Sequence, residues 1–568
     1  MLLSTPEQIE QYSSSGHWGE DRLDVLFARQ AKDREDDLAL VDDQDLHAIS
    51  GRKPQCLSFI RTWRRVVALS EFLTGIGMKS DTVVAMLLPP GSDAAVITLV
   101  ASRLGLILAP LPLISGEADI KEKLEQVGAK AIVCCSHYED EPVAERVRNV
   151  AADMFSIRFV FCLGDGAPEG LIDLAPVLEE EDSVSEEALF EHSYQISANS
   201  VLALHWSAAG SERGRPIGRS HNHLLAQARY VSEQTDLVSE DCIFVTHHLS
   251  GLVGFVSGLV SALDVGARVQ FHAFKSNARL CQTLAEFGGQ HVSLPGGQWQ
   301  AIHDLLPMPV REQLKSVTLV WNKSHVGQTS FGENETAARI VDLTDFHELV
   351  LFSQIRRDPS EIGPVSVGEI ASIKDPEMIW METFLFGMEE ARARGEDKVL
   401  GGELCLKGPM LPDCAYPLVG MVEGEALPRT EEGFIHTEIG CRVVQNEVDE
   451  QKAMFQPLGD LADVLTIGGF AERGRDLDDL YRQCSGVSDA AAFLAPCNDG
   501  GPGQLMAALV VDDRDIGREL FYGSLKDMGV SKMKWPREVI FVEAIPRHTN
   551  GKVMRDSLIA ASDVSNVA

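Results

Sequence analysis

A short loop between two apolar stretches carries the residue types that a phosphate group needs. It reads Ser-Ala-Ala-Gly-Ser-Glu-Arg-Gly-Arg over residues 207–215 and stands between a strand-like run and a helix-like run. Backbone N–H groups, hydroxyls and cations beside a helix N-terminus can bind a polyphosphate such as that of ATP. The alternative is an ordinary turn, because no Gly-Lys-Ser/Thr of the Walker pattern follows Gly210. The candidate phosphate-binding residues are Ser207, Gly210, Ser211, Arg213, Gly214 and Arg215.

The C-terminal tail places a lysine beside a glycine in a basic setting. In IPRHTNGKVMRDSL, residues 545–558, Lys552 follows Gly551 and lies near Arg547 and Arg555. A mobile ammonium of this kind can stabilise the charge that develops around a reacting phosphorus atom. The alternative is a solvated basic terminus. Lys552 is therefore the candidate catalytic residue.

Two adjacent histidines, His247 and His248, lie between a strand-like run and the apolar run Leu249–Leu263. Either histidine could contact a ligand, or both could be hydrogen-bonded structural groups. The sequence shows no HExxH, no Ser-His-Asp arrangement and no carboxylate cluster at metal spacing. We therefore predict no metal ligands from these patterns.

These candidates belong to an alternating series of predicted helices and strands. Apolar residues at helical spacing predict a helix in 59–78, and short β-branched runs around it predict buried strands. The Gly-rich loop follows a strand predicted at 200–206 and precedes a helix predicted at 223–234. This order indicates a mixed α/β fold with largely parallel sheets flanked by helices. The other predicted strands are 82–90, 129–135, 156–164, 242–251, 267–274, 291–296 and 317–321.

The pattern changes after residue 364 to short, Gly-punctuated segments of period two, which predict a small β barrel or sheet. Toward the C-terminus, a helix predicted at 476–484 and strands at 507–513 and 537–544 indicate a compact α+β unit. We therefore expect a large N-terminal domain, 1–458, and a small mobile C-terminal domain, 459–568.

Composition limits the classes of partner. The chain has 568 residues, of which 45% are hydrophobic, so it can bury a large core. A net charge of −35 disfavours nucleic acid and anionic lipid as partners. The 11 cysteines form no CxxC pair, which indicates reduced thiols in a cytoplasmic protein. No secretory signal is visible, and Leu249–Leu263 is too short to span a membrane, so we expect a core helix there and no membrane insertion.

Seven segments form a recognisable series along nearly the whole chain. In this order they resemble the adenylate-forming superfamily of acyl-CoA synthetases and aryl-acid–AMP ligases. YSSSGHW and RSHN make the resemblance closest to the stand-alone aryl-acid–AMP ligases and related carboxylate–CoA ligases. The segments are YSSSGHW at 12–18, SAAGSERGRPIGRSHN at 207–222, HHLSG at 247–251, GELCLKGP at 402–409, GFIHTEIG at 433–440, GDLADVLTIGGF at 459–470 and PRHTNGKVMR at 546–555.

The resemblance implies a reaction in two steps. A small carboxylic acid attacks the α-phosphate of ATP, with Mg²⁺, to release pyrophosphate, and a thiol of CoA or of carrier-protein phosphopantetheine then takes the acyl group. It assigns Lys552 to the first step, residues 207–215 to the phosphates and His248 to the acyl pocket. The remaining assignments are Gly468 and Gly469 in the turn of the thiol tunnel, and Thr437 and Glu438 at the ribose.

Several positions depart from the family pattern. Glu212 adds negative charge to the phosphate loop, and Asp460 stands where the family has the arginine of a Gly-Arg pair. No Tyr-Gly-x-Thr-Glu occurs around LVLFSQIRRDPSE, so the glutamate that holds Mg²⁺ is missing or displaced, with Glu361 as the candidate. The ribose motif Thr-Gly-Asp is one residue short at Thr437-Glu438.

Two functions therefore remain open. The chain is either an active ligase, or a degenerate member that binds a ligand or a partner protein without ATP chemistry. An amide-forming synthetase is a third alternative, which the sequence does not distinguish from thioester formation. Leu249 follows His248 where dihydroxybenzoate-specific members have an Asn, which favours an apolar or alicyclic acid.

Overall fold

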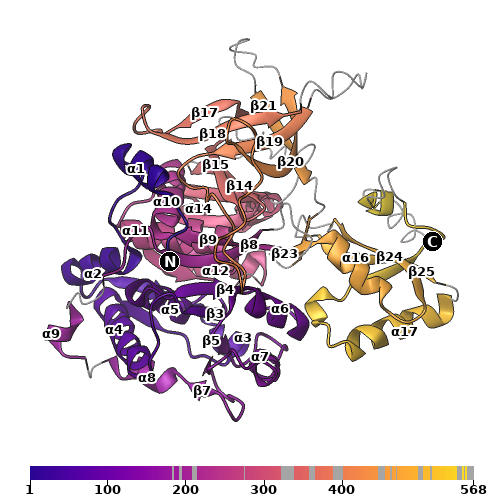
Figure 1. Ribbon diagram of the computed structural model, residues 1–568, viewed down its shortest axis with the longest axis horizontal. Coiled ribbons are helices and arrows are strands. Elements are labelled where there is room, and N and C mark those ends of the chain that lie inside the picture. The colour runs from indigo at the N-terminus through magenta and orange to yellow at the C-terminus, as the bar shows by residue number, and fades with distance from the viewer. Residues whose placement is uncertain are drawn as a thin grey trace. The chain divides into compact units, whose positions relative to one another are not determined.

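The chain forms two compact units (Figure 1). The first comprises Met1–Leu113 and Ile120–Gly459, and the second comprises Ile114–Asp119 and Asp460–Ala568. The computed structural model describes residues 1–181, 184–190, 195–207, 214–273, 275–321, 338–356, 365–387, 401–444, 454–460, 464–467, 470–496, 503–511, 514–546, 553–555 and 557–559.

A seven-stranded sheet in the first unit carries the Gly-rich loop. All its strands run parallel to their neighbours except β9, which pairs antiparallel with β8. The strands predicted at 82–90, 129–135, 156–164 and 200–206 are confirmed. In spatial order the strands are β7 (Ile172–Asp173), β6 (Phe159–Leu163), β5 (Ala131–Cys135), β3 (Val83–Leu87), β4 (Ile107–Pro110), β8 (Val201–Ser207) and β9 (Arg215–Ser220).

The loop at 207–215 connects two strands rather than a strand and a helix. β8 ends at Ser207, and β9 intervenes before α10 begins at His221. The expectation that the loop directly precedes a helix N-terminus is therefore wrong. Pro216 disguised the strand, because proline cannot donate to a β ladder, yet β9 tolerates it as the edge strand of the sheet.

An eight-stranded sheet forms the second layer of the first unit. Its strands are parallel except at the two edges, where β2 and β15 pair antiparallel with their neighbours. Each of the predicted strands at 242–251, 267–274, 291–296 and 317–321 is confirmed, with differences at its ends. In spatial order they are β15 (Val350–Ile355), β14 (Arg339–Phe346), β13 (Ser316–Trp321), β12 (His291–Pro295), β10 (Cys242–Val245), β11 (Arg268–Phe271), β1 (Leu38–Val41) and β2 (Cys56–Ser58).

Helices pack on these two sheets. The apolar run Leu249–Leu263 contains a buried π-helix, η2 (Val253–Val260), which continues into α11 (Ser261–Val265), so the predicted core helix is confirmed. α10 packs against η2, and α4 packs against α5. The helices of this unit are α1 (Pro6–Ser14), α2 (Leu23–Asp33), α3 (Leu46–Ser50), α4 (Phe59–Gly75), α5 (Ser92–Leu104), α6 (Glu117–Val127, which begins in the segment grouped with the second unit), α7 (Val143–Ala152), α8 (Ala175–Glu179), α9 (Glu186–Leu189), α10 (His221–Thr235), α12 (Asn277–Phe287), the 3-10 helix η3 (Gly296–Gln298), α13 (Trp299–Leu305) and α14 (Met308–Gln313).

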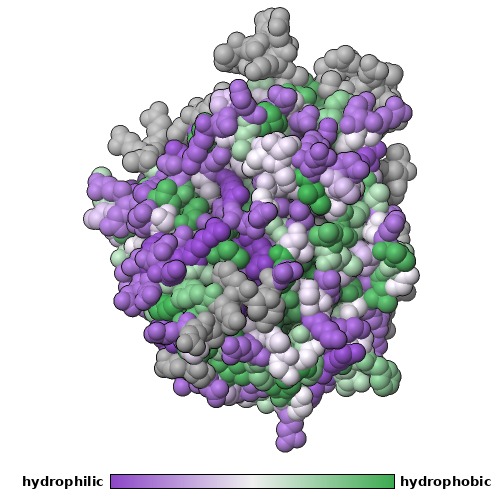
Figure 2. Space-filling model, turned by 60° about the vertical axis from the view of Figure 1, so that its left-hand side comes forward, coloured by the Kyte–Doolittle hydropathy of each residue, from purple (hydrophilic) through white to green (hydrophobic). Residues whose placement is uncertain are grey.

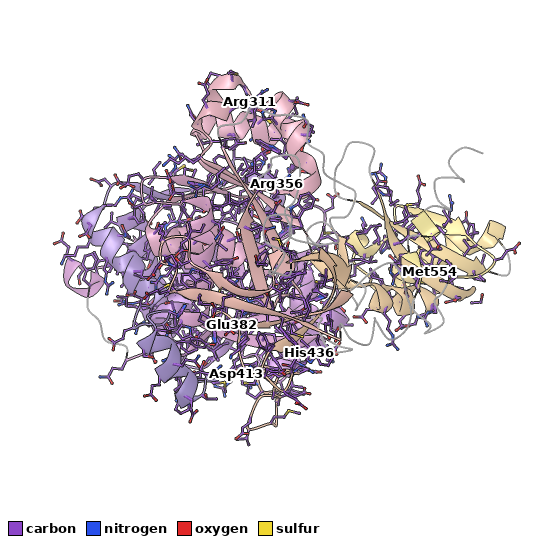
Figure 3. The ribbon with its side chains drawn as sticks, turned by 90° about the horizontal axis from the view of Figure 1, so that it is seen from above. Arg311, Arg356, Glu382, Asp413, His436 and Met554 are labelled. Carbon is purple, nitrogen blue, oxygen red and sulfur yellow. The ribbon has the colours of Figure 1, made fainter. Side chains whose placement is uncertain are left out.

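A six-stranded sheet follows in the chain, and Glu382 and His436 are labelled on it in Figure 3. β17, β18, β19 and β20 form consecutive antiparallel pairs. Among the described residues the short edge strands β16 and β17 do not pair with each other, so of the two predicted forms, a barrel or a sheet, the chain forms an open sheet. In spatial order its strands are β16 (Val365–Ser366), β21 (Met454–Asp460), β20 (Ile435–Val444), β19 (Gly401–Lys407), β18 (Ile379–Phe386) and β17 (Gly368–Ala371).

The second unit has its own apolar core, in which Tyr481 and Phe521 are fully buried. The predicted helix at 476–484 and the strands at 507–513 and 537–544 are confirmed with small shifts of their ends. Its elements are β22 (Val464–Ile467), β23 (Phe470–Arg473), α16 (Gly474–Arg482), β24 (Val487–Ala495), β25 (Gln504–Val511), α17 (Arg514–Asp527), the 3-10 helix η4 (Lys532–Lys534) and β26 (Glu538–Phe541).

The chain is thus a mixed α/β protein with several sheets flanked by helices. On the face shown in Figure 2, hydrophobic residues are interspersed with hydrophilic ones rather than gathered in one band. None of the helices in the described ranges combines the length and the apolarity that a membrane-crossing segment requires.

Candidate active site

The carboxyl ends of strands from the two large sheets meet at one place. Ser207, the last residue of β8, donates a hydrogen bond from Oγ to the carbonyl oxygen of His347 at 2.6 Å. His347 and Glu348 follow β14 and form a tight turn, with φ angles of 55° and 57°. Ligands of α/β proteins bind in the crevice beyond such strand ends. Ser207 therefore ties the start of the Gly-rich loop to a strained turn of the other sheet.

Arg219 holds the same turn from β9. Its Nη2 donates to the carbonyl oxygen of Leu349 at 2.8 Å and also to that of Glu348. The guanidinium is fully buried, and this burial lowers the pKa of Arg219 to about 10. The charges of Glu348 and Asp345 act in the opposite direction and raise this pKa. Arg219 thus remains a cation at neutral pH and fixes the backbone of the turn.

Glu348 is a buried acidic residue of this turn that the sequence analysis did not single out. Its Oε2 accepts the backbone N–H of Leu252 at 2.7 Å, and its own N–H donates to Oδ1 of Asp345 at 2.9 Å. Burial, followed by the charge of Asp345, raises the pKa of Glu348 well above its usual range. Glu361, the candidate from the sequence, lies outside the described residues. The overlooked signal was Thr-Asp-Phe-His-Glu at 344–348, directly after a β-branched run.

His248 meets a residue from the other sheet. His248 follows β10, Tyr138 follows β5, and the distance from the Tyr138 hydroxyl to His248 Nε2 is 3.5 Å. The two rings pack edge to face with centroids 5.8 Å apart. Burial, followed by the proximity of His247, lowers the pKa of His248 to about 3. At neutral pH His248 is therefore an uncharged hydrogen-bonding group.

A glycine of η2 sets the position of the histidine segment. A Cβ atom on Gly254 would lie 2.3 Å from the carbonyl oxygen of His248 and 2.6 Å from that of His247. Only glycine allows this approach of the helix to the two carbonyls. The geometry of His247 and His248 thus depends directly on Gly254.

The other end of the Gly-rich loop faces an acidic cavity. Gly214 has a φ of 70°, which favours glycine, and Arg215 begins β9 with Nη2 at 3.5 Å from Oε1 of Glu425. A cavity of about 450 Å³ beside Arg215 is also lined by Glu122 and Glu125. Acidic side chains therefore outnumber the arginine on this side of β9.

The predicted ribose residues lie in the six-stranded sheet. Thr437 is fully buried, and its Oγ1 donates to the carbonyl oxygen of Leu404 at 2.7 Å, so its hydroxyl faces the sheet. Glu438 is half-buried and has a φ of 59°. Two of the described candidates therefore lie near the His347–Glu348 turn. Ser207 bonds to His347, and His248 lies four residues before Leu252, whose N–H bonds to Glu348. Gly210, Ser211, Arg213, Gly468, Gly469 and Lys552 lie outside the described residues.

The fold and the site define an α/β protein in which segments at strand ends of the two large sheets contact each other at a candidate ligand site. A family model, described as AMP-binding enzyme, matches residues 27–416. The chain belongs to this family of AMP-binding enzymes.

Curated relatives and solved structures extend the similarity along the chain. The chain is 21% identical to a medium-chain fatty-acid–CoA ligase of Escherichia coli (strain K12), covering 98% of this chain and 93% of that protein. It is 23% identical to a 4-coumarate–CoA ligase of Pinus taeda, covering 89% of each. The amide bond synthetase McbA from Marinactinospora thermotolerans shares the fold with a TM-score of 0.68 at 16% identity, covering 94% of this chain and 99% of that one.

Proposed function

We propose that the chain is an AMP-forming carboxylate ligase. It joins a small carboxylic acid to ATP, releases pyrophosphate and forms an acyl-adenylate, and a thiol of CoA or of carrier-protein phosphopantetheine then takes the acyl group. The observation that carries this proposal is the junction of Ser207 with the His347–Glu348 turn, in a chain of the AMP-binding enzyme family.

The residues around this junction suggest separate roles. Ser207 at the end of β8 and Gly214, with its left-handed φ, directly before β9 are the described ends of the Gly-rich loop. We expect backbone N–H groups of the loop between them to bind the phosphates of ATP. The hydroxyl of Ser207 donates its proton to the carbonyl oxygen of His347, so this hydroxyl can only accept a further hydrogen bond. We further propose that 459–568 acts as a mobile domain, which supplies Lys552 for adenylation and Gly468 and Gly469 for the thiol step.

Glu348 suits a magnesium ion that accompanies ATP. Its carboxylate lies near Asp345, and hard oxygen ligands of this kind are those that Mg²⁺ prefers beside phosphate groups. The raised pKa of Glu348 means that the anion is disfavoured at this position, and a nearby cation would favour its ionisation. When bound, Mg²⁺ would offset the negative charge of the phosphates. In this chain, Glu348 is the residue that would hold it.

The surroundings of His248 favour an acid with an apolar body. His248 is uncharged at neutral pH, and burial raises the pKa of Tyr138 above its usual range, so Tyr138 is also uncharged. Leu249 and Phe255, which follow in the chain, are fully buried apolar residues. Neutral groups of this kind do not select a second charge on the substrate. The relatives named as fatty-acid and 4-coumarate ligases act on acids of this class.

Pyrophosphate release tests the proposal. The full chain is incubated with ATP, Mg²⁺ and a panel of medium-chain, aromatic and alicyclic carboxylic acids, and release is compared with reactions that lack the acid. We expect acid-dependent release with at least one member of the panel, and thioester formation when CoA is added. An absence of acid-dependent release across the panel, together with no ATP·Mg²⁺ binding at millimolar nucleotide by calorimetry, would contradict it.

A second function has specific support. Arg215 is paired with Glu425 beside an acidic cavity, and the hydroxyl of Thr437 is used inside the sheet. Both observations favour a member that has kept the fold but binds a ligand or partner without ATP chemistry. This alternative predicts that an apolar acid binds in calorimetry while ATP·Mg²⁺ does not, whereas the ligase requires both to bind.

A further inference from the structure

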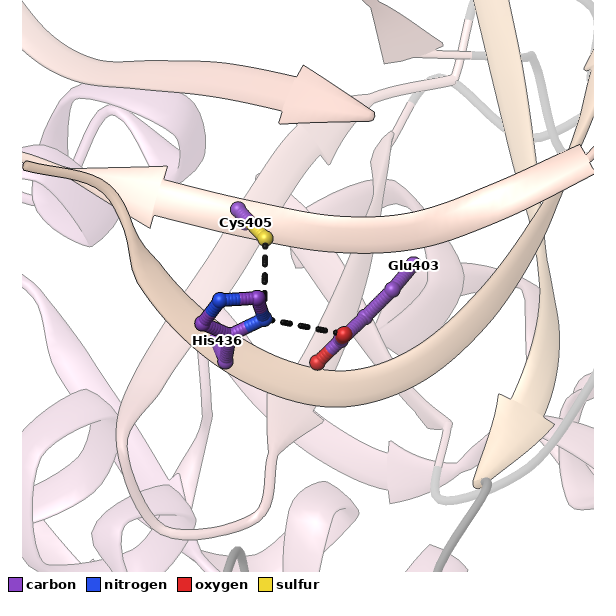
Figure 4. A group of neighbouring side chains, drawn as sticks. All are labelled: Glu403, Cys405 and His436. Carbon is purple, nitrogen blue, oxygen red and sulfur yellow. Dashed lines mark hydrogen bonds and ion pairs between the residues drawn. The ribbon is translucent and has the colours of Figure 1, made fainter. Parts of the chain in front are cut away.

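Three side chains with metal-binding atoms lie together in the six-stranded sheet. They are Glu403 and Cys405 of β19 and His436 of β20 (Figure 4). His436 Nδ1 lies 2.9 Å from Oε2 of Glu403 and 3.6 Å from Sγ of Cys405. The three ligand atoms all lie within 4.8 Å of one another.

A break in the strand register creates this arrangement. β19 and β20 pair Leu404 with Ile439 and then Cys405 with His436, so two residues of β20 bulge out of the ladder. One of them, Glu438, donates its backbone N–H to Oε1 of Glu403 at 2.9 Å. This bond holds the Glu403 carboxylate in place, and leaves Oε2 directed at His436.

We propose that Glu403, Cys405 and His436 bind a zinc ion. Thiolate, imidazole and carboxylate are the three ligand types that Zn²⁺ takes, and three protein ligands with a water form a common tetrahedral set. Zinc bonds of usual length place sulfur and nitrogen about 3.6 Å apart and nitrogen and oxygen about 3.4 Å apart. The observed sulfur–nitrogen separation of 3.6 Å matches this geometry, and the nitrogen–oxygen separation of 2.9 Å requires a small outward movement of Glu403.

Hydrogen bonding alone satisfies this cluster poorly. His436 Nδ1 faces both the thiol and the carboxylate, and it can carry only one proton. If Nδ1 is protonated it donates to Glu403, and it cannot accept the thiol proton. If Nδ1 is bare it accepts from Cys405 but faces the negative carboxylate. A cation between the three atoms satisfies all of them.

The burial of the three residues suits an ion that enters from solvent. Cys405 is fully buried, which shields the sulfur, whereas the side chains of Glu403 and His436 are 19% and 21% exposed. An entry path is one of the requirements for a metal site, together with suitable ligands and a satisfied outer shell. Glu438 supplies that outer shell through its N–H, and the rings of Phe386 and His436 pack edge to face with centroids 5.0 Å apart.

Cobalt titration of the full chain tests the site. The protein is treated with a chelator, dialysed and titrated with Co²⁺, which reports thiolate coordination through a charge-transfer band in the near ultraviolet. We expect the band to saturate at one equivalent and to disappear when Zn²⁺ is added. The band should be lost in Cys405→Ser and kept in Cys441→Ser, a matched control at a buried cysteine of the neighbouring strand β20.

Two results with the cysteine variants and the wild type would overturn the zinc site, and a third comes from His436. One is the absence of a thiolate band in the wild-type chain, and the other is a band that survives in Cys405→Ser. If Cys405→Ser does not fold by circular dichroism, His436→Gln keeps the thiol and should weaken Co²⁺ binding at least ~10-fold, the lower end of the effect of losing even an outer-shell partner. Unchanged affinity in His436→Gln would equally refute the proposal. Neither readout depends on ligase activity.

Discussion

The contact between Gly254 and the histidine segment gives the sharpest structural prediction. We expect Gly254→Ala to destabilise the protein and to displace His248. The added Cβ would lie 2.3 Å from the carbonyl oxygen of His248, whereas ordinary contacts begin at 3.4 Å. The carbonyls of His247 and His248 must therefore retreat by about 1 Å, because both atoms are backbone and have no rotamer to change.

The size of both effects follows from that displacement. Overpacking of a close-packed interior costs about 1–3 kcal/mol, and we expect the free energy of unfolding to fall by this amount. A misplacement of about 1 Å at a reacting group can reduce the rate by about 10²-fold, so pyrophosphate release should fall by that factor if His248 lines the acyl pocket. The stability effect does not depend on the proposed activity.

Urea unfolding and pyrophosphate release measure the two effects separately. The matched control is Gly523→Ala in α17, where an added Cβ has no heavy atom within 4 Å. There alanine should stabilise the second unit by about 0.5–1 kcal/mol through its helix preference. A Gly254→Ala chain that unfolds at the wild-type urea concentration and keeps wild-type activity would refute the close approach on which this reasoning rests.

Three further predictions concern the candidate site. Ser207→Ala should lower the free energy of unfolding by about 0.5–1.5 kcal/mol, since the hydrogen bond from Ser207 Oγ to the His347 carbonyl is lost; an unchanged urea unfolding midpoint would contradict this. Lys552→Ala should reduce acyl-adenylate formation by roughly 10²–10³-fold at an unchanged unfolding midpoint, measured by pyrophosphate release. The pKa of Glu348 is raised in the folded protein, so the wild-type free energy of unfolding should fall as the pH rises from the ordinary pKa of 4.5 toward the pKa of the folded state. Glu348→Gln should flatten this fall, and parallel plots of the free energy of unfolding against pH for the two chains would argue against it.

Most of the first unit could be predicted from local patterns. Buried parallel strands such as β3 and β5 are short β-branched runs, and α4 has apolar residues at helical spacing after its cap at Ser58. β9 could not be predicted, because its Pro216 breaks the strand pattern and only the edge position in the folded sheet makes it acceptable. The six-stranded sheet was predicted as a barrel or a sheet, since closure depends on pairing between distant strands.

The site was harder to predict than the fold, because its contacts connect residues far apart in the chain. Ser207 was a candidate from its loop, but its partner His347 lies 140 residues later and carries no motif. Glu348, which we propose as the magnesium-binding glutamate, was not a candidate because this residue was sought at 349–361, a range that begins directly after it. The cluster of Glu403, Cys405 and His436 has no metal spacing in the sequence, since it depends on the register break between β19 and β20.

The shortened ribose motif and the proposed zinc cluster are parts of one local structure. Glu438 adopts a φ of 59°, in the left-handed region that favours glycine. It directly follows Thr437, and the family motif Thr-Gly-Asp has a glycine directly after its threonine. A non-glycine residue in such a conformation costs of order 1 kcal/mol or more and persists only where its surroundings enforce it. Here the enforcing contact is the bond from the Glu438 N–H to Glu403, whose other oxygen faces His436. The conformation of the bulge therefore depends on where Glu403 is held. An ion that draws Glu403, Cys405 and His436 together would consequently also fix the backbone at Thr437 and Glu438, so a single bound metal would order the segment that stands in the position of the ribose motif.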